Sequence, residues 1–182
     1  MDIVDETIKL LEKFDGRIYD SLYDELYITP EQNQYFKDTK IRDENGELLV
    51  VYHGTNIEFD IFDKEHIKTG SAGGDGFYFT PNRADAISYS AGSEIVYSCF
   101  LNITNPFIYR YHTDFNKIND LYKEAYENKM KFEEYLQSKG YDGIILTEYG
   151  RDDMYIAFEP NQIKSIYNEN PTSSNNMYEN FE

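Results

Sequence analysis

The residues best suited to hold a ligand lie in two short motifs, VVYHGT at residues 50–55 and GFYFTPNRADAISYS at residues 76–90. His53 follows a β-rich run, so its imidazole can hydrogen-bond a ligand hydroxyl at the end of a strand. Gly54 and Thr55 come next, and the missing Cβ of the glycine lets a ligand approach the backbone. The first motif therefore indicates a binding position for a hydroxylated ligand.

Two tyrosines of the second motif are placed to enclose a flat ring. Tyr78 lies in a β-rich run, and Tyr89 lies in the helical run that follows it. Aromatic faces attract a flat cation through stacking and cation–π interaction, worth roughly 0.5 to 2 kcal/mol each. Because the chain contains 18 tyrosines, the strand-then-helix placement, and not the residue type, selects this pair.

A turn and a strand are expected to position His53. Asn45 and Gly46 are a strong signal for a tight turn, and residues 48–52 form a β-rich run directly afterwards. We therefore expect a hairpin that leads into a buried strand, with His53 at the end of that strand.

A strand and a helix are expected to carry the two tyrosines. GFYFT at residues 76–80 is typical of a strand. Thr80 is expected to act as the N-cap of the next helix, with Pro81 in its first turn and Gly92 as its C-cap. The sequence thus places Tyr78 in the strand and Tyr89 near the end of the helix.

Further segments are expected to complete the fold around these motifs. The predicted helices lie over residues 3–14, after Thr29 as N-cap with Pro30 and Gln32 in the first turn, and over residues 114–139, ended by Gly140. The predicted strands lie over residues 94–103, which NPF at 105–107 ends, over residues 141–148 and over residues 154–160. This order predicts an α+β fold with split antiparallel sheets and flanking helices.

Composition narrows the classes of partner. The chain of 182 residues suits one domain, and its formal net charge of −17 disfavours nucleic acid as a partner because phosphates would be repelled. Cys99 is the only cysteine and is expected to be a buried thiol. No apolar run approaches the roughly 18 residues that a membrane span needs, so we expect a soluble cytoplasmic protein with no membrane partner.

Taken in order, VVYHGT, GFYFTPNRADAISYS and YIAFEPNQIKS resemble the His-Tyr-Glu class of ADP-ribosyltransferases, which includes diphtheria toxin and the poly(ADP-ribose) polymerases. The segments YFKDTKIRDENGELLVVYHGT and YIAFEPNQIKS are similar to the branch of polyvalent proteins of phages and mobile elements. The resemblance covers about residues 35–172. Residues 1–34 are then expected as an N-terminal helical extension and residues 173–182 as a flexible acidic tail.

This resemblance implies that the split sheets form a cleft for NAD, which serves as substrate, and that no metal is needed. His53, with Gly54 and Thr55, would hold the adenosine ribose, and Tyr78 and Tyr89 would enclose the nicotinamide. The implied reaction is mono-ADP-ribosyl transfer to a host macromolecule in the host cytoplasm, with release of nicotinamide. A protein is the expected target, and nucleic acid is less favoured.

The chain departs from the family pattern at the catalytic acid. The family has a Glu directly before the last YIVY-like strand, and Met154 stands there in this chain. Asp153 is our first candidate to replace that Glu, and the alternatives are Asp152, Glu148 and Glu159. In a regular strand Asp153 would face away from the side that Met154 faces, so its use requires a bulge or an irregular strand start. Asp152 has the same parity as Met154 but lies about 6 to 7 Å further along.

Two other functions follow from the same observations. Because Met154 removes the acid, the chain is alternatively an inactive protein that binds NAD or ADP-ribose and acts through a partner surface. Because of the −17 charge, it is alternatively an acidic decoy that blocks a nucleic-acid-binding protein. His53 would be needed in the transferase and in the inactive binder, and it would be dispensable in the decoy.

Overall fold

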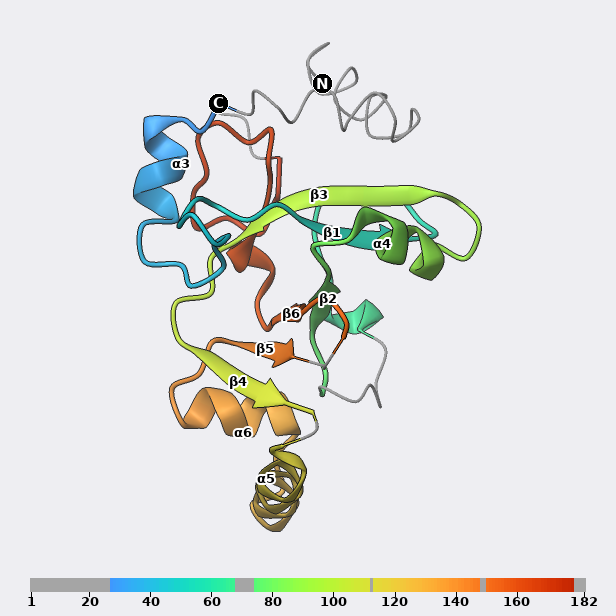
Figure 1. Ribbon diagram of the computed structural model, residues 1–182, viewed down its shortest axis with the longest axis vertical. Helices are drawn as coiled ribbons and strands as arrows, with labels where there is room; N and C mark the ends of the chain where they lie inside the picture. Colours follow the sequence, from blue (N-terminus) through green and yellow to red (C-terminus); the bar gives the residue numbers. More distant parts are fainter. Residues whose placement is uncertain (1–26, 68–73, 112, 148–149, 179–182) are drawn as a thin grey trace.

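Two β-sheets form the framework of the protein, shown as a computed structural model that describes residues 27–67, 74–111, 113–147 and 150–178 (Figure 1). The first sheet is antiparallel and has the strand order β1 Val51–Thr55, β3 Ile95–Leu101 and β7 Ile163–Ser165. The second sheet has the strand order β2 Phe77–Phe79, β6 Met154–Ala157, β5 Gly143–Thr147 and β4 Pro106–Arg110. The predicted α+β fold with split sheets is confirmed.

The second sheet is mixed and not purely antiparallel, because β4 and β5 run parallel. The motif NPF predicts only the end of the preceding strand, yet Pro106 begins β4. A proline is tolerated as the first residue of a strand, where its missing N–H breaks no ladder hydrogen bond.

The helices pack on the outside of both sheets, and two single-turn 3-10 helices connect other elements (Figure 1). The α-helices are α3 Pro30–Tyr35, α4 Arg83–Tyr89, α5 Phe115–Glu127 and α6 Phe132–Ser138. The 3-10 helices are η2 Lys64–His66 and η3 Pro160–Gln162. None of the helices among the described residues combines the length and hydrophobicity needed to cross a membrane. The helix predicted over residues 3–14 lies outside the described residues.

The single helix predicted over residues 114–139 is wrong, because the chain forms two helices there. The break falls at Lys129, whose backbone is left-handed with φ 58°. The N–H of Met130 then bonds back to the carbonyl of Ala125, which closes α5 before α6 begins at Phe132. Gly140, with φ 90°, follows the C-cap of α6 as expected.

The two predicted helix caps have different outcomes. The Thr29 hydroxyl accepts from the Gln32 N–H at 3.1 Å, and the Gln32 side chain accepts from the Thr29 N–H at 2.9 Å, so that capping box is confirmed. The N-cap of α4, by contrast, is Asn82 and not Thr80. Thr80 still belongs to the strand region, because its backbone N–H and carbonyl both pair with Tyr52.

The hydrophobic core fills both sides of the second sheet. One cluster lies between the sheets and includes Phe62, Phe79 and Cys99, which is fully buried as predicted. The other lies between the second sheet and helices α5 and α6, where Leu136 and Ile156 are fully buried. Side chains on alternate positions of β2 and β6 therefore face two different clusters.

The segment expected as a loose tail is packed as far as residue 178. Met177 is fully buried, and the Lys164 ammonium, also fully buried, donates to the carbonyls of Ser174 at 2.5 Å and Asn176 at 3.0 Å. The Met177 N–H also donates to the Asp60 carbonyl. Polar composition predicts a solvated tail, but here the backbone of the segment supplies acceptors that a distant buried lysine needs.

Candidate functional site

His53 lies on β1 with its imidazole fixed in one orientation. Its Nδ1 lies 2.8 Å from the carbonyl oxygen of Tyr78. Because a carbonyl only accepts, Nδ1 carries the hydrogen, and in the neutral ring Nε2 is an acceptor. Burial lowers the pKa of His53, which keeps the ring neutral at neutral pH. The geometry thus gives a single, defined acceptor for a hydroxyl group.

Aromatic side chains surround the His53 ring. Its centroid lies 5.0 Å from that of Phe62, 5.4 Å from that of Phe79 and 6.2 Å from that of Phe59. The imidazole remains half-buried and not fully enclosed. The apolar walls explain the lowered pKa, since they solvate the charged imidazolium poorly.

Gly54 serves the packing of α4 and not the approach of a ligand to its Cα. A Cβ at this position would lie 1.7 Å from the backbone oxygen of Ala86 and 2.7 Å from its carbonyl carbon. Thr55 continues the same contact, since its carbonyl accepts from the Ser93 hydroxyl at 2.6 Å in the turn after α4. Both residues therefore fix α4 against β1, beside His53.

The backbone and the ring of Tyr78 make contacts on opposite sides of the second sheet: its carbonyl bonds His53, and its ring faces helices α5 and α6. The ring packs against the cluster beneath α5 and α6, and its hydroxyl donates to the Gly74 carbonyl at 2.6 Å. Tyr78 pairs with Ile156 across the strands, so both side chains occupy the same face of the second sheet. His53 and Tyr78, the two motif residues, are thus joined directly.

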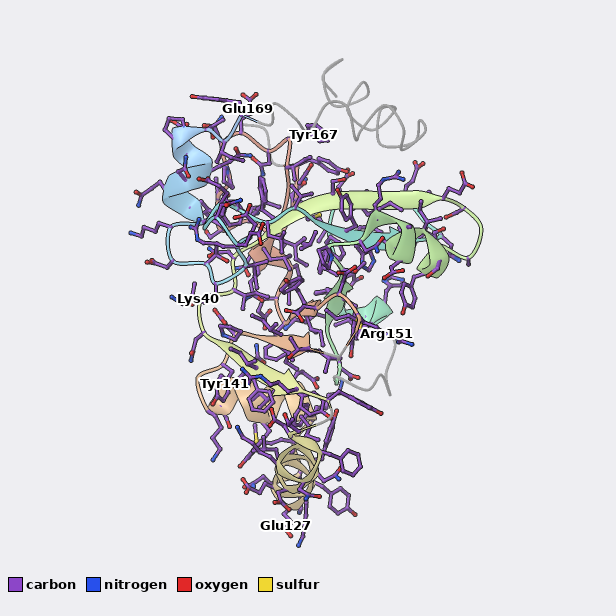
Figure 2. All side chains as sticks on the ribbon, viewed as in Figure 1. Lys40, Glu127, Tyr141, Arg151, Tyr167 and Glu169 are labelled. Atoms are coloured by element: carbon purple, nitrogen blue, oxygen red, sulfur yellow. The ribbon has the colours of Figure 1, made fainter. Side chains whose placement is uncertain are left out.

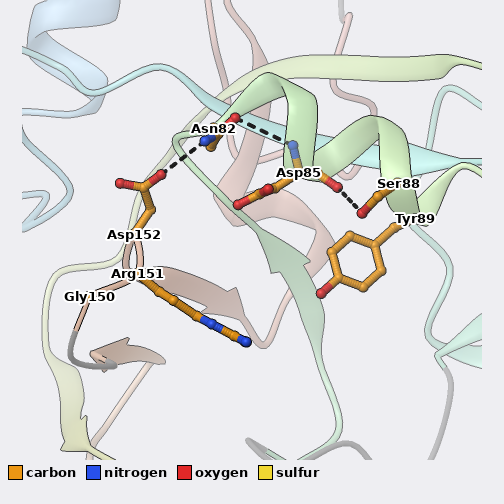
Figure 3. A pocket seen from close by; sticks show the side chains of 7 residues that line it. All are labelled: Asn82, Asp85, Ser88, Tyr89, Gly150, Arg151 and Asp152. Carbon is orange, nitrogen blue, oxygen red and sulfur yellow. Dashed lines mark hydrogen bonds between the residues drawn. The ribbon is translucent and has the colours of Figure 1, made fainter.

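Tyr89 lies on a separate open pocket of about 630 Å³ under α4 (Figure 3). Its side chain is 69% exposed, which leaves the ring available to a ligand. The pocket is lined on the helix side by Asn82, Asp85, Ser88 and Tyr89, and on the other side by Gly150, Arg151 and Asp152. The structure therefore brings Tyr89 together with Asp152, and does not place Tyr78 in the same pocket.

The two candidate acids before β6 differ in environment. Asp152 is exposed, and one of its oxygens accepts from the Asn82 amide at 3.1 Å. Asp153 is half-buried and outside the pocket lining, and its pKa is raised, first by burial and then by the charge of Asp152. Burial and the charges of the two aspartates also raise the pKa of Tyr155 to about 12. The negative charge of both carboxylates thus disfavours ionisation of the Tyr155 hydroxyl.

Met154 starts β6 in regular register. It pairs with Leu146, and its side chain packs on the cluster that also holds Tyr78 and Ile156. The pairing continues without a bulge to Ala157. The strand Met154–Ala157 therefore has no bulge of the kind that would bring Asp153 onto the face shared by Met154 and Tyr78.

Of the other two alternative acids, Glu159 lies outside the lining of this pocket. Glu159 caps η3, forms an ion pair with Lys64 at 2.6 Å and accepts from the Gln137 amide at 2.9 Å. It is thus engaged in structure. Glu148 lies outside the described residues.

The sequence analysis does not single out five lining residues of the pocket, namely Asn82, Asp85, Ser88, Gly150 and Arg151. Asn82 carries one usable signal, because asparagine is a preferred N-cap and it directly follows Pro81. Arg151 is the cation that directly precedes the two aspartates in the sequence. In the part of the chain that the structure describes, no group of His, Cys, Asp and Glu is arranged to hold a metal ion.

A family model matches most of the chain. It is described as ADP-Ribosyltransferase in polyvalent proteins and matches residues 43–173. The match begins in the turn before β1, ends after β7, and contains His53, Tyr78, Tyr89 and Met154. No curated protein matches the chain.

Proposed function

Because the chain belongs to the family of ADP-ribosyltransferases in polyvalent proteins, we propose that it transfers ADP-ribose from NAD to a host macromolecule and releases nicotinamide. The observation that carries the proposal is the bond from His53 Nδ1 to the Tyr78 carbonyl, 2.8 Å long. It joins the two motifs and leaves Nε2 as an acceptor in the middle of β1, where His53 lies, and not at the predicted strand end.

In this proposal His53 Nε2 accepts a hydrogen bond from a hydroxyl of the adenosine ribose. Gly54 and Thr55 shape the wall beside it through their contacts with α4 and its following turn. The exposed ring of Tyr89 stacks on the nicotinamide, whereas Tyr78, whose ring packs beneath α5 and α6, contributes through the carbonyl that orients His53. A cationic pyridinium gains stacking and cation–π attraction from such rings.

The reaction breaks the bond between the ribose C1″ and the nicotinamide nitrogen. The bonding electrons leave with nicotinamide, whose ring becomes neutral, and the ribose becomes oxocarbenium-like. Because β6 starts in regular register, Asp153 has the parity of Tyr155, whose ring packs in the cluster that borders His53, and not the parity of Met154. No bulge is needed for that side, and we propose that the ionised Asp153 carboxylate stabilises this cation from the His53 side. The acceptor then attacks C1″ and loses its proton.

Transfer of a single unit is the outcome that Met154 favours. Its thioether is only a weak acceptor and cannot activate the hydroxyl of a bound ADP-ribose for chain growth. The formal charge of −17 favours a protein acceptor over nucleic acid. We propose a phage or mobile-element effector that acts in the host cytoplasm.

A second candidate is an inactive protein that binds NAD or ADP-ribose. It is favoured by the same Met154, which packs on the hydrophobic cluster and offers no charge to the reaction. This candidate predicts that NAD binds and that its nicotinamide is not released.

The test is the release of nicotinamide from NAD by the purified protein, with and without a bacterial lysate, together with NAD binding by calorimetry. We expect release that rises with lysate and falls about 100-fold or more in His53→Ala, because a ribose-orienting contact is lost. His66→Ala is the matched control, since that side chain is 72% exposed and pairs only with Asp63 among the described residues. Melting curves for both variants show whether they remain folded.

Each outcome selects one function. Binding without release in every condition supports the inactive binder. Release that is equal in His53→Ala, His66→Ala and the wild type would overturn the proposed site.

A further inference from the structure

The side chain of Asn82 forms hydrogen bonds in two directions (Figure 3). Its oxygen accepts from the N–H groups of Ala84 at 3.0 Å and Asp85 at 3.4 Å, which caps α4. Its nitrogen donates to the Asp152 carboxylate at 3.1 Å. Of the residues that favour N-caps, only asparagine combines an acceptor with an amide donor in this way.

This residue joins the two walls of the α4 pocket, defined above by its seven lining residues. One wall is the helix that ends in Tyr89, and the other is the segment 150–152 that leads into β6. The two bonded residues are 70 positions apart in the chain. The contact therefore ties the position of the aromatic wall to that of the acidic segment.

We propose that Asn82 is a positioning residue that fixes the acidic segment relative to Tyr89. Asp152 is the anchor of this link, and the neighbouring Asp153 is the carboxylate whose place it sets. The inference rests on the proposed function. It assigns different tasks to two adjacent aspartates that composition alone makes equivalent.

The capping role can be separated from the linking role by chemistry. Aspartate and asparagine cap helices about equally well. In Asn82→Asp the cap oxygen is kept, but the donor to Asp152 is lost and a second negative charge stands beside that carboxylate. The variant therefore breaks the link while preserving the helix.

A reversed pair offers rescue. Asp152→Asn alone keeps an acceptor oxygen for Asn82 and is expected to retain the link. When it is combined with Asn82→Asp, the amide at position 152 donates to the carboxylate at position 82, which restores the hydrogen bond in the opposite direction.

The experiment measures kcat and KM for nicotinamide release, with melting temperatures, in the wild type, the two single variants and the double variant. We expect kcat to fall about 10- to 100-fold in Asn82→Asp, with KM and melting temperature little changed, because misplacement of a reacting group acts on the chemical step. The double variant is expected to recover to within about threefold of Asp152→Asn. Asn45→Asp is the matched control, because Asn45 also donates to an aspartate carboxylate but is exposed and lies outside the pocket.

Two results would overturn the inference while leaving the proposed function intact. One is an Asn82→Asp variant no slower than Asn45→Asp, and the other is a double variant as slow as Asn82→Asp. A wild-type protein that releases no nicotinamide would instead overturn the proposed transferase itself, and the positioning role with it.

Discussion

Polar side chains are used in opposite ways in two regions of the molecule. In one region, which we call the C-terminal anchor and define by Gln32, Lys164, Asn168 and Met177, they are buried and bonded to backbone carbonyls. Figure 2 places Tyr167 and Glu169 in this region, beside α3, and Arg151 in the middle part of the molecule, at the α4 pocket. In the α4 pocket, by contrast, most polar side chains are exposed to solvent, and Asn82 and Asp152 are bonded to each other.

The C-terminal anchor satisfies each of its buried donors internally. The Gln32 amide donates to the carbonyls of Ile166 and Asn168, and the Asn168 amide donates to the carbonyl of Met177. Such groups are costly to leave unpaired and stabilise one arrangement of the chain when they are paired. Most residues of the α4 pocket are exposed instead, so a ligand can reach their polar groups.

The largest expected effect tests whether the α4 side of the molecule is built on a rigid contact. In Gly54→Ala the new Cβ would overlap the Ala86 backbone oxygen, which it would approach to 1.7 Å. Backbone cannot move aside as a flexible side chain does, so we expect a loss of at least about 3 kcal/mol in the free energy of unfolding. Urea denaturation followed by circular dichroism measures it.

Gly150→Ala is the matched change in the α4 pocket. Gly150 has φ +77° and open space around it, so only backbone strain is added, about 1 to 2 kcal/mol. Equal losses for the two variants would show that α4 does not need its close approach to β1.

A smaller effect is expected when the C-terminal anchor loses its cation. Lys164→Met keeps much of the side-chain volume but removes the donor to the carbonyls of Ser174 and Asn176. We expect a loss of about 2 to 3 kcal/mol, because hydrogen bonds from charged groups contribute more than neutral ones. The amides of residues 174–178 should then exchange their hydrogens faster.

Arg151→Met is the control from the α4 pocket. This side chain is exposed, so a change within about 0.5 kcal/mol is expected. If Arg151→Met destabilised the protein as much as Lys164→Met, the contrast between the C-terminal anchor and the α4 pocket would be wrong.

The parts of the fold that depend on neighbours in sequence could be predicted. The capping box of Thr29 and Gln32, the turn at Gly46 and the strand around Tyr78 each follow from residue types a few positions apart. The order of motifs also indicates the family, which the match over residues 43–173 confirms.

The remaining features depend on contacts between distant segments. Lys164 is buried because carbonyls from the following segment reach it, and nothing in its own neighbourhood signals that pairing. The link between Asn82 and Asp152 likewise crosses 70 positions. The candidate site is predicted only in part for the same reason: His53 and Tyr78 meet, but one wall of the Tyr89 pocket, residues 150–152, comes from a distant stretch of chain.

The smallest effect on stability is the most informative about function. Asp153 is half-buried, and burial and the Asp152 charge raise its pKa. A carboxyl whose pKa is higher in the folded protein than in the unfolded chain favours folding below its unfolded pKa, and this contribution is lost as the pH rises through the folded pKa. At neutral pH the ionised Asp153 therefore weakens the fold slightly.

Asp153→Asn should consequently be more stable than the wild type at neutral pH, by about 0.5 kcal/mol or less, and the difference should vanish in acid. Urea denaturation at neutral pH and below pH 4 measures both values.

If Asp153 stabilises the oxocarbenium-like ribose, the same variant should lose nicotinamide release about 100-fold or more. In the wild type, release should fall on the acid side at a higher pH than an ordinary aspartate would give. A variant that is both stabilised and fully active would show that the raised pKa has no part in the reaction, and would transfer the catalytic role to Asp152. A gain in stability coupled to a loss of activity is instead the signature of a residue kept for function at a cost to the fold.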